Sequence, residues 1–140
     1  MSMTDQESVS TLLSKAYECL RGANLGAATQ FLDQALAADY EHEEVLYSLK
    51  CANFWNDRLA RLSSMANPFE RGEYVLSQWK SFGSFTSKLS PDFERTRYAF
   101  KRFVFSLALE QYRELPPEEH ESHEAELSLR IGRCLKGAGD

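Results

Sequence analysis

The stretch from Ala16 to Tyr40 constrains the fold of this chain more than any other. An apolar-periodic segment ends at the break Arg21-Gly22-Ala23-Asn24, and a second one follows, in which Ala28, Leu32 and Ala35 are four and three residues apart. This pattern predicts two helices that fold back on each other. Small residues let the two backbones approach closely, and larger apolar residues fill the remaining space. The small residues at the expected contact are Ala16, Ala27, Ala28 and Ala35.

The same periodicity predicts about six helices in all. Their expected ranges are 5–21, 25–38, 43–65, 68–89, 90–115 and 118–140. In the fourth, Gly72 and Gly83 each weaken the helix by about 1 kcal/mol relative to alanine, and we expect a kink or a close helix contact at Gly83. In the fifth, apolar residues occupy most of the circumference between Tyr98 and Leu109, so it is either the central helix, which we expect, or part of an interface.

Length and charge narrow the class of protein. A chain of 140 residues, 43% of them hydrophobic, is long enough for one globular domain with a substantial core. Residues 1–48 carry eight acids and two bases, residues 49–113 six and eleven, and residues 114–140 seven and three. A basic middle therefore lies between two acidic ends. These charges either form ordinary solvated faces and intrachain pairs, or indicate an acidic partner or a second copy met head to tail.

The cysteines and the first ten residues indicate in which cellular compartment the protein is expected. Cys19, Cys51 and Cys134 are odd in number, far apart and in no C-x-x-C pair, which predicts reduced, mostly buried thiols of a cytoplasmic protein. The first ten residues are polar, so we expect no signal peptide. No stretch approaches the roughly 18 apolar residues of a membrane span, and we expect no membrane partner.

The first helical pair resembles a tetratricopeptide repeat. Ala28 and Leu32 match the family's step from alanine to a large apolar residue, and Ala35-Leu36 followed by Asp39-Tyr40 match its ending, with Tyr40 in place of the usual proline. No tryptophan opens the first helix. The resemblance implies an all-α fold of antiparallel helical hairpins, stacked in a right-handed superhelix.

The last segment resembles the first helix of a further repeat, with Ile131-Gly132, Leu135 and Gly139-Asp140 at the matching places. The expected organisation is a single domain with a first repeat at about 5–40, an irregular long-helix middle at about 43–115 and this last helix at about 118–140. We expect the chain to be an N-terminal piece of a longer repeat protein. The alternative is that the last helix is a solvating cap of the kind that repeat arrays need.

No catalytic or cofactor-binding pattern is present, so we expect no enzyme. His120 and His123 could share one helix face, but zinc needs three or four converging ligands, and we expect no metal site. The cysteines have no histidine nearby in the sequence, and no phosphate loop or dinucleotide fingerprint occurs. An unrecognised enzyme is a third choice, behind two binding functions.

The fifth helix also carries a pattern typical of single-stranded nucleic-acid binding, in which basic and aromatic residues alternate. The residues are Arg95, Arg97, Tyr98, Phe100, Lys101 and Arg102. The whole chain has a net charge of -5, however, whereas nucleic-acid-binding domains are strongly basic. We therefore expect no nucleic-acid partner.

The tetratricopeptide resemblance implies a protein or peptide partner, bound in a concave groove lined by the first helix of each pair. Members that bind acidic chaperone tails use a lysine and asparagine clamp, where this sequence has Leu13 and Tyr17, so we expect an amphipathic or apolar ligand instead. The alternative is that the middle helices fold over the groove and its aromatics are core. The predicted groove residues are Leu13, Tyr17, Arg21, Glu44, Tyr47, Cys51, Trp55, Arg130 and Arg133, with Ser14, Ser48, Glu126 and Leu129 beside them.

The sequence thus predicts a non-catalytic interaction scaffold or adaptor. The alternative from another class is a self-assembly module of a larger protein, in which the basic middle and the aromatic fifth helix form a homodimer.

Overall fold

The structure is a computed structural model that describes residues 3–139, with the side chains of 3–7, 121 and 122 left undescribed. This part of the chain is all-α and contains no strand. The predicted helix ends agree with the observed ones to within a few residues. The helices are α1 (Met3–Arg21), α2 (Leu25–Ala38), α3 (Glu43–Leu62), α4 (Pro68–Thr86), α5 (Glu94–Arg113) and α6 (Pro117–Gly137).

Local side chains explain where α2 and α4 begin. The Asn24 side chain accepts a hydrogen bond from the backbone N–H of Ala27 at 3.0 Å, and Asn67 does the same for Glu70 at 3.0 Å. Each asparagine satisfies one of the N–H groups that a helix start leaves without a partner. Pro68 then occupies the first position of α4, where its missing N–H costs nothing. These signals are local, so the sequence alone predicts these helix starts.

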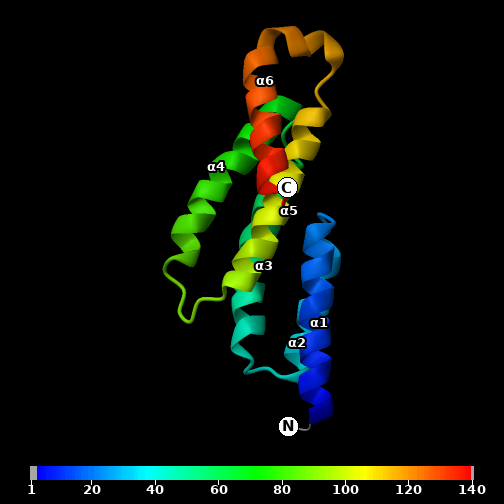
Figure 1. Ribbon diagram of the computed structural model, residues 1–140, viewed down its shortest axis with the longest axis vertical. Helices are drawn as coiled ribbons and strands as arrows, with labels where there is room; N and C mark the ends of the chain where they lie inside the picture. Colours follow the sequence, from blue (N-terminus) through cyan, green and yellow to red (C-terminus); the bar gives the residue numbers. More distant parts are fainter. Residues whose placement is uncertain (1–2, 140) are drawn as a thin grey trace.

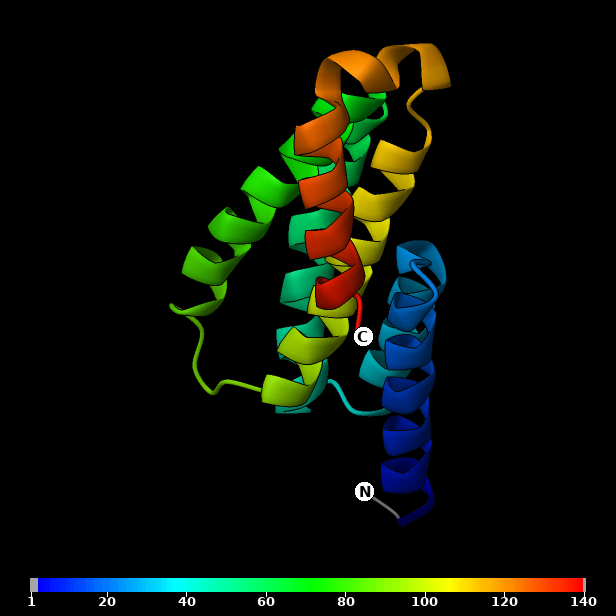
Figure 2. The same cartoon turned by 45° about the horizontal axis from the view of Figure 1, so that its top comes forward.

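The helices are arranged around α5 (Figures 1 and 2). α1 and α2 form an antiparallel pair, and α5 packs against α1, α3, α4 and α6. The first turns of α6 cross the end of the bundle, and the helix then runs back along α5. α5 is therefore the central helix. Its buried residues are Thr96, Ala99, Phe100, Phe103, Val104, Phe105, Leu107, Ala108, Leu109, Gln111 and Tyr112.

Aromatic rings fill the space between α3, α4 and α5. Trp55 lies 5.5 Å from Phe82 and 6.3 Å from Phe103, measured between ring centroids, and Phe82 lies 5.8 Å from Phe100. Each such pair contributes about 0.5–1.5 kcal/mol beyond the burial of its area. The indole N–H of Trp55 is buried without an acceptor among the described residues, so the packing of this ring offsets the cost of an unmade hydrogen bond.

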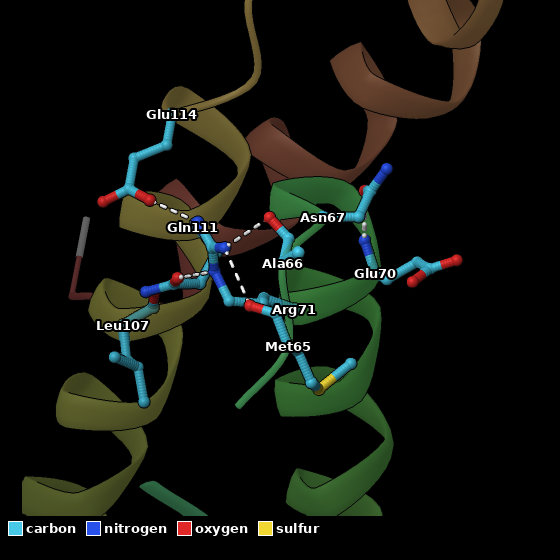
Figure 3. Close-up of polar contacts among 8 residues, drawn as sticks. All are labelled: Met65, Ala66, Asn67, Glu70, Arg71, Leu107, Gln111 and Glu114. Atoms are coloured by element: carbon cyan, nitrogen blue, oxygen red, sulfur yellow. Dashed lines mark hydrogen bonds and ion pairs between the residues drawn. The ribbon is translucent and has the colours of Figure 1, made fainter. Parts of the chain in front are cut away.

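Arg71 fastens the start of α4 to the end of α5 (Figure 3). Its guanidinium donates to the backbone carbonyls of Met65 at 3.1 Å and Ala66 at 2.9 Å, and to the side chain of Gln111 at 2.8 Å. It also forms an ion pair with Glu114. One side chain therefore satisfies the two carbonyls of the α3–α4 turn and holds that turn against α5.

Gly72 is where α4 comes closest to α5. A Cβ atom added there would lie 2.5 Å from the ring of Tyr112, which is fully buried. At Gly83 an added Cβ would meet no atom within 4 Å. The close contact expected at Gly83 is therefore at Gly72 instead, because α4 packs its first half, and not its last turn, flat on the Tyr112 ring.

This difference predicts opposite effects of one substitution at two positions of the same helix. Gly72→Ala should lower the free energy of unfolding, because forcing a methyl group into packed atoms costs about 1 to 3 kcal/mol and exceeds the gain in helix propensity. Gly83→Ala should raise it by up to about 1 kcal/mol, from helix propensity alone. Urea denaturation followed by circular dichroism measures both. Equal changes in the two variants would contradict the close contact at Gly72.

Candidate partner-binding groove

α5 occupies the side of α1 and α3 where the tetratricopeptide resemblance implies a groove. The Tyr47 hydroxyl donates to Asp92, which precedes α5, at 2.9 Å, and the Trp55 ring packs on Phe103 of α5. These contacts agree with the alternative expectation, in which the middle helices cover this side and the aromatic residues belong to the core. The buried members of the predicted groove are Leu13, Tyr47, Cys51 and Trp55.

Tyr17, another predicted groove residue, links three helices. Its hydroxyl donates to Glu44 of α3 at 2.6 Å and lies 3.0 Å from Ser48 Oγ of α3 and 2.7 Å from Thr96 Oγ1 of α5. Burial raises the pKa of Tyr17 well above its usual value, and the Glu44 carboxylate adds to that rise. The phenol therefore stays protonated, and Tyr17 and Glu44 hold α1, α3 and α5 together.

The remaining three predicted residues are arginines. Arg21 is exposed at the end of α1 and lines neither of the cavities described below. Arg130 and Arg133, one turn apart on α6, both line a cavity of about 530 Å³ between α6 and α4. Only these two of the nine predicted residues thus meet at a cavity, and they do so with α4 rather than with α1 and α3.

Two cavities lie end to end along α4. The cavity between α4 and α6 is lined by Leu76, Ser77, Trp79 and Lys80 from α4, together with the two arginines and Glu73. The other, of about 640 Å³, lies between the second half of α4 and the start of α5. Trp79 lines both, and the two cavities together are called the α4 groove. Its lining at the α5 end includes Phe82, Glu94, Arg97, Tyr98 and Lys101, with Asp92 before α5.

Trp79 is at the centre of the α4 groove. Its half-buried ring packs on Phe82 at 5.8 Å and on Phe105 at 5.4 Å between centroids. Its indole N–H is not buried and has no hydrogen-bond acceptor in the described part of the chain. A rigid, half-exposed tryptophan with a free donor is the kind of side chain that contributes most to protein interfaces.

Cations outnumber unpaired acids along the groove. Lys80, Lys101 and Arg133 are exposed, and none forms an ion pair with a described residue. Glu73 accepts hydrogen bonds from Tyr112 and from Arg130, each at 2.8 Å. At the other end Asp92 is hydrogen-bonded and Glu94 is, among the described residues, an unpaired acid, so three unpaired cations outnumber one unpaired acid and the free charge of the groove is positive.

Asp92 is held by two donors. Arg97 donates to it at 2.8 Å and 3.0 Å, and Tyr47 donates to the same carboxylate. These hydrogen bonds, that of Arg97 first, hold the pKa of Asp92 below its usual value. Asp92 therefore stays ionised and neutralises Arg97, leaving Lys101 as the free cation at this end.

Most of the basic and aromatic residues noted on the fifth helix have partners within the chain. Arg95 donates to Ser14 at 3.0 Å, Arg102 donates to the carbonyl of Ala138 at 3.1 Å, and Phe100 is fully buried. Only Tyr98 and Lys101 remain open, and both line the α4 groove. The sequence pattern included these two among six basic and aromatic residues of this helix. It did not indicate Trp79 or Lys80, because nothing in the sequence distinguishes a groove tryptophan from a core one.

The histidines have structural roles. His120 lies 2.7 Å from the carbonyl of Leu115, near the end of α5, and the His123 ring stacks on Phe69 with centroids 4.3 Å apart. Within the residues that the structure describes, no group of three or more potential metal ligands comes together. No helix in that part of the chain is both long and apolar enough to cross a membrane.

The three cysteines are free thiols that differ in burial. Cys51 and Cys134 are fully buried, and burial raises the pKa of Cys51 to about 12 and that of Cys134 to about 11. Cys19 is half-buried. The thiolate is the reactive form of cysteine, so the two buried side chains are poor nucleophiles.

We therefore expect slow alkylation of Cys51 and Cys134 by iodoacetamide at pH 8. A thiol whose pKa lies three units above the pH is ionised in about one molecule in a thousand, and burial also blocks the reagent. Peptide mass spectrometry should find Cys19 modified first and the other two only after urea is added. Modification of all three at one rate in the native protein would contradict this arrangement.

No protein-family model, curated protein or solved structure matches the chain. Its function is therefore inferred from the groove.

Proposed function

We propose that the protein is a non-catalytic, tetratricopeptide-like interaction module that binds a segment of a partner protein in the α4 groove. The observation that carries this proposal is the position of Trp79, half-exposed where the two cavities meet. Binding energy at protein interfaces is concentrated in a few such aromatic side chains, surrounded by contacts that exclude water.

The shape of the groove favours an elongated ligand. A single small-molecule site is one concave pocket of roughly 300–1,000 Å³. Here two open depressions of about 530 and 640 Å³ follow one helix on either side of a shared side chain. An extended strand or a short helix of a partner would place successive side chains into the two depressions. We place this activity in the cytoplasm, because three free thiols are typical of reducing compartments.

Affinity capture with matched aromatic variants tests the proposal. The chain and its Trp79→Ala variant are immobilised and exposed to lysate of the source cells. Tyr40→Ala serves as control, because Tyr40 is 74% exposed and lies outside the groove. We expect a protein retained by the chain and by Tyr40→Ala, and reduced about tenfold or more by Trp79→Ala. Equal retention by all three, each shown to be folded by circular dichroism, would contradict binding in the α4 groove.

Self-assembly is the second candidate function. The observation that favours it is that two leucines of α6 are exposed, Leu129 at 68% and Leu135 at 37%. Exposed apolar side chains on a surface helix can form a contact between two copies. If it dimerises, light scattering should give twice the chain mass, and Leu129→Glu with Leu135→Glu should restore the monomer. A monomer at all concentrations for the unsubstituted chain would remove this candidate.

A further inference from the structure

We infer that the α4 groove takes an acidic peptide segment with an apolar or aromatic side chain at its middle, because free cations lie on both sides of Trp79. This inference rests on the proposed function and names the chemistry of the partner. Lys80 and Arg133 flank the tryptophan at the α6 end of the groove, and Lys101 flanks it at the α5 end.

Two of the three acids that line the groove are occupied by partners within the chain. Glu73 is occupied by Tyr112 and Arg130, and Asp92 by Arg97 and Tyr47. Of the described lining residues, only Glu94 is an acid that no cation hydrogen-bonds. Three unpaired cations, Lys80, Lys101 and Arg133, thus outnumber this one acid and leave the groove attractive to carboxylates that a ligand brings. Charge complementarity of this kind sets partner choice and association rate.

The distribution of the cations favours a chain of carboxylates over a phosphate. A phosphate site gathers several donors on one compact anion, whereas these three cations lie on two sides of an indole ring. Nucleic acid would bring its charge along the whole surface of a chain whose net charge is -5. A peptide brings its acids only where the groove is positive, and it places an apolar side chain on Trp79.

Fluorescence polarisation with three synthetic probes tests the inference on the full chain. The first is a short fluorescein-labelled peptide of glutamates on either side of a central Leu-Phe. The second replaces every glutamate with lysine, and the third replaces Leu-Phe with Ala-Ala. We expect the first to bind, more weakly as salt is raised, and the other two to bind at least about tenfold more weakly. The fluorescence of Trp79 should change with the first probe and not in a Trp79→Phe variant.

Charge-reversal variants locate the site. Lys80→Glu with Arg133→Glu should weaken the first probe about tenfold or more. The matched control is Lys50→Glu with Arg61→Glu, two exposed residues of α3 outside the groove, which carries the same change in net charge and should stay within about twofold. Equal weakening by both pairs would mean attraction by net charge alone and would overturn the inference.

The remaining outcomes separate this inference from the proposed function. Tighter binding of the lysine probe, lost in Trp79→Ala, would overturn the acidic partner while leaving the groove as a peptide site. Displacement of the first probe by a single-stranded oligonucleotide at lower concentration than by unlabelled peptide would also overturn it, as would a dimer that Trp79→Ala dissociates. Failure of every probe, with capture unaffected by Trp79→Ala, would overturn both.

Discussion

The burial of most of α5 among four neighbouring helices is the constraint on which the rest of the structure depends. Its apolar residues surround the helix, so no single neighbour can cover them, and four helices pack around it. Even its buried hydroxyl, Thr96, is satisfied only because Tyr17 of α1 and Ser48 of α3 both reach it. The cost of leaving any of these faces in water brings α1 and α3 onto α5 and fills the space that an open repeat groove would occupy.

The α4 groove exists because α4 and α6 each pack along only part of α5. α4 is held at its start by Arg71 and by the contact of Gly72 with Tyr112. α6 runs back along α5 only as far as Gly137, which lies against Phe105 in the middle of that helix. The first half of α5 therefore lines the groove beside the second half of α4, while α6 flanks the other end (Figure 1).

A sequence predicts the local signals that begin and end helices better than it predicts the contacts between helices. Asn24, Asn67 and Pro68 act within one turn of their own positions, so the helix ends follow from the sequence. Which glycine meets a neighbour depends on how two helices cross, and the sequence pattern pointed to Gly83 where the contact is at Gly72. The same limit applies to the candidate site, because an aromatic side chain that packs in a core and one that anchors a partner have the same hydrophobic pattern.

The sequence by itself determined an all-α fold and the approximate bounds of the six helices among the described residues, and it favoured the fifth as the central one, because period, caps and an apolar circumference are properties of single segments. The tertiary structure alone decided which side chains face solvent. It buried Tyr47 and Trp55 under α5, left Trp79 half-open, and placed Lys80 and Arg133 across one cavity although they are far apart in the chain. A groove is formed by several helices together, and its lining depends on the packing angles between them, which no single segment determines.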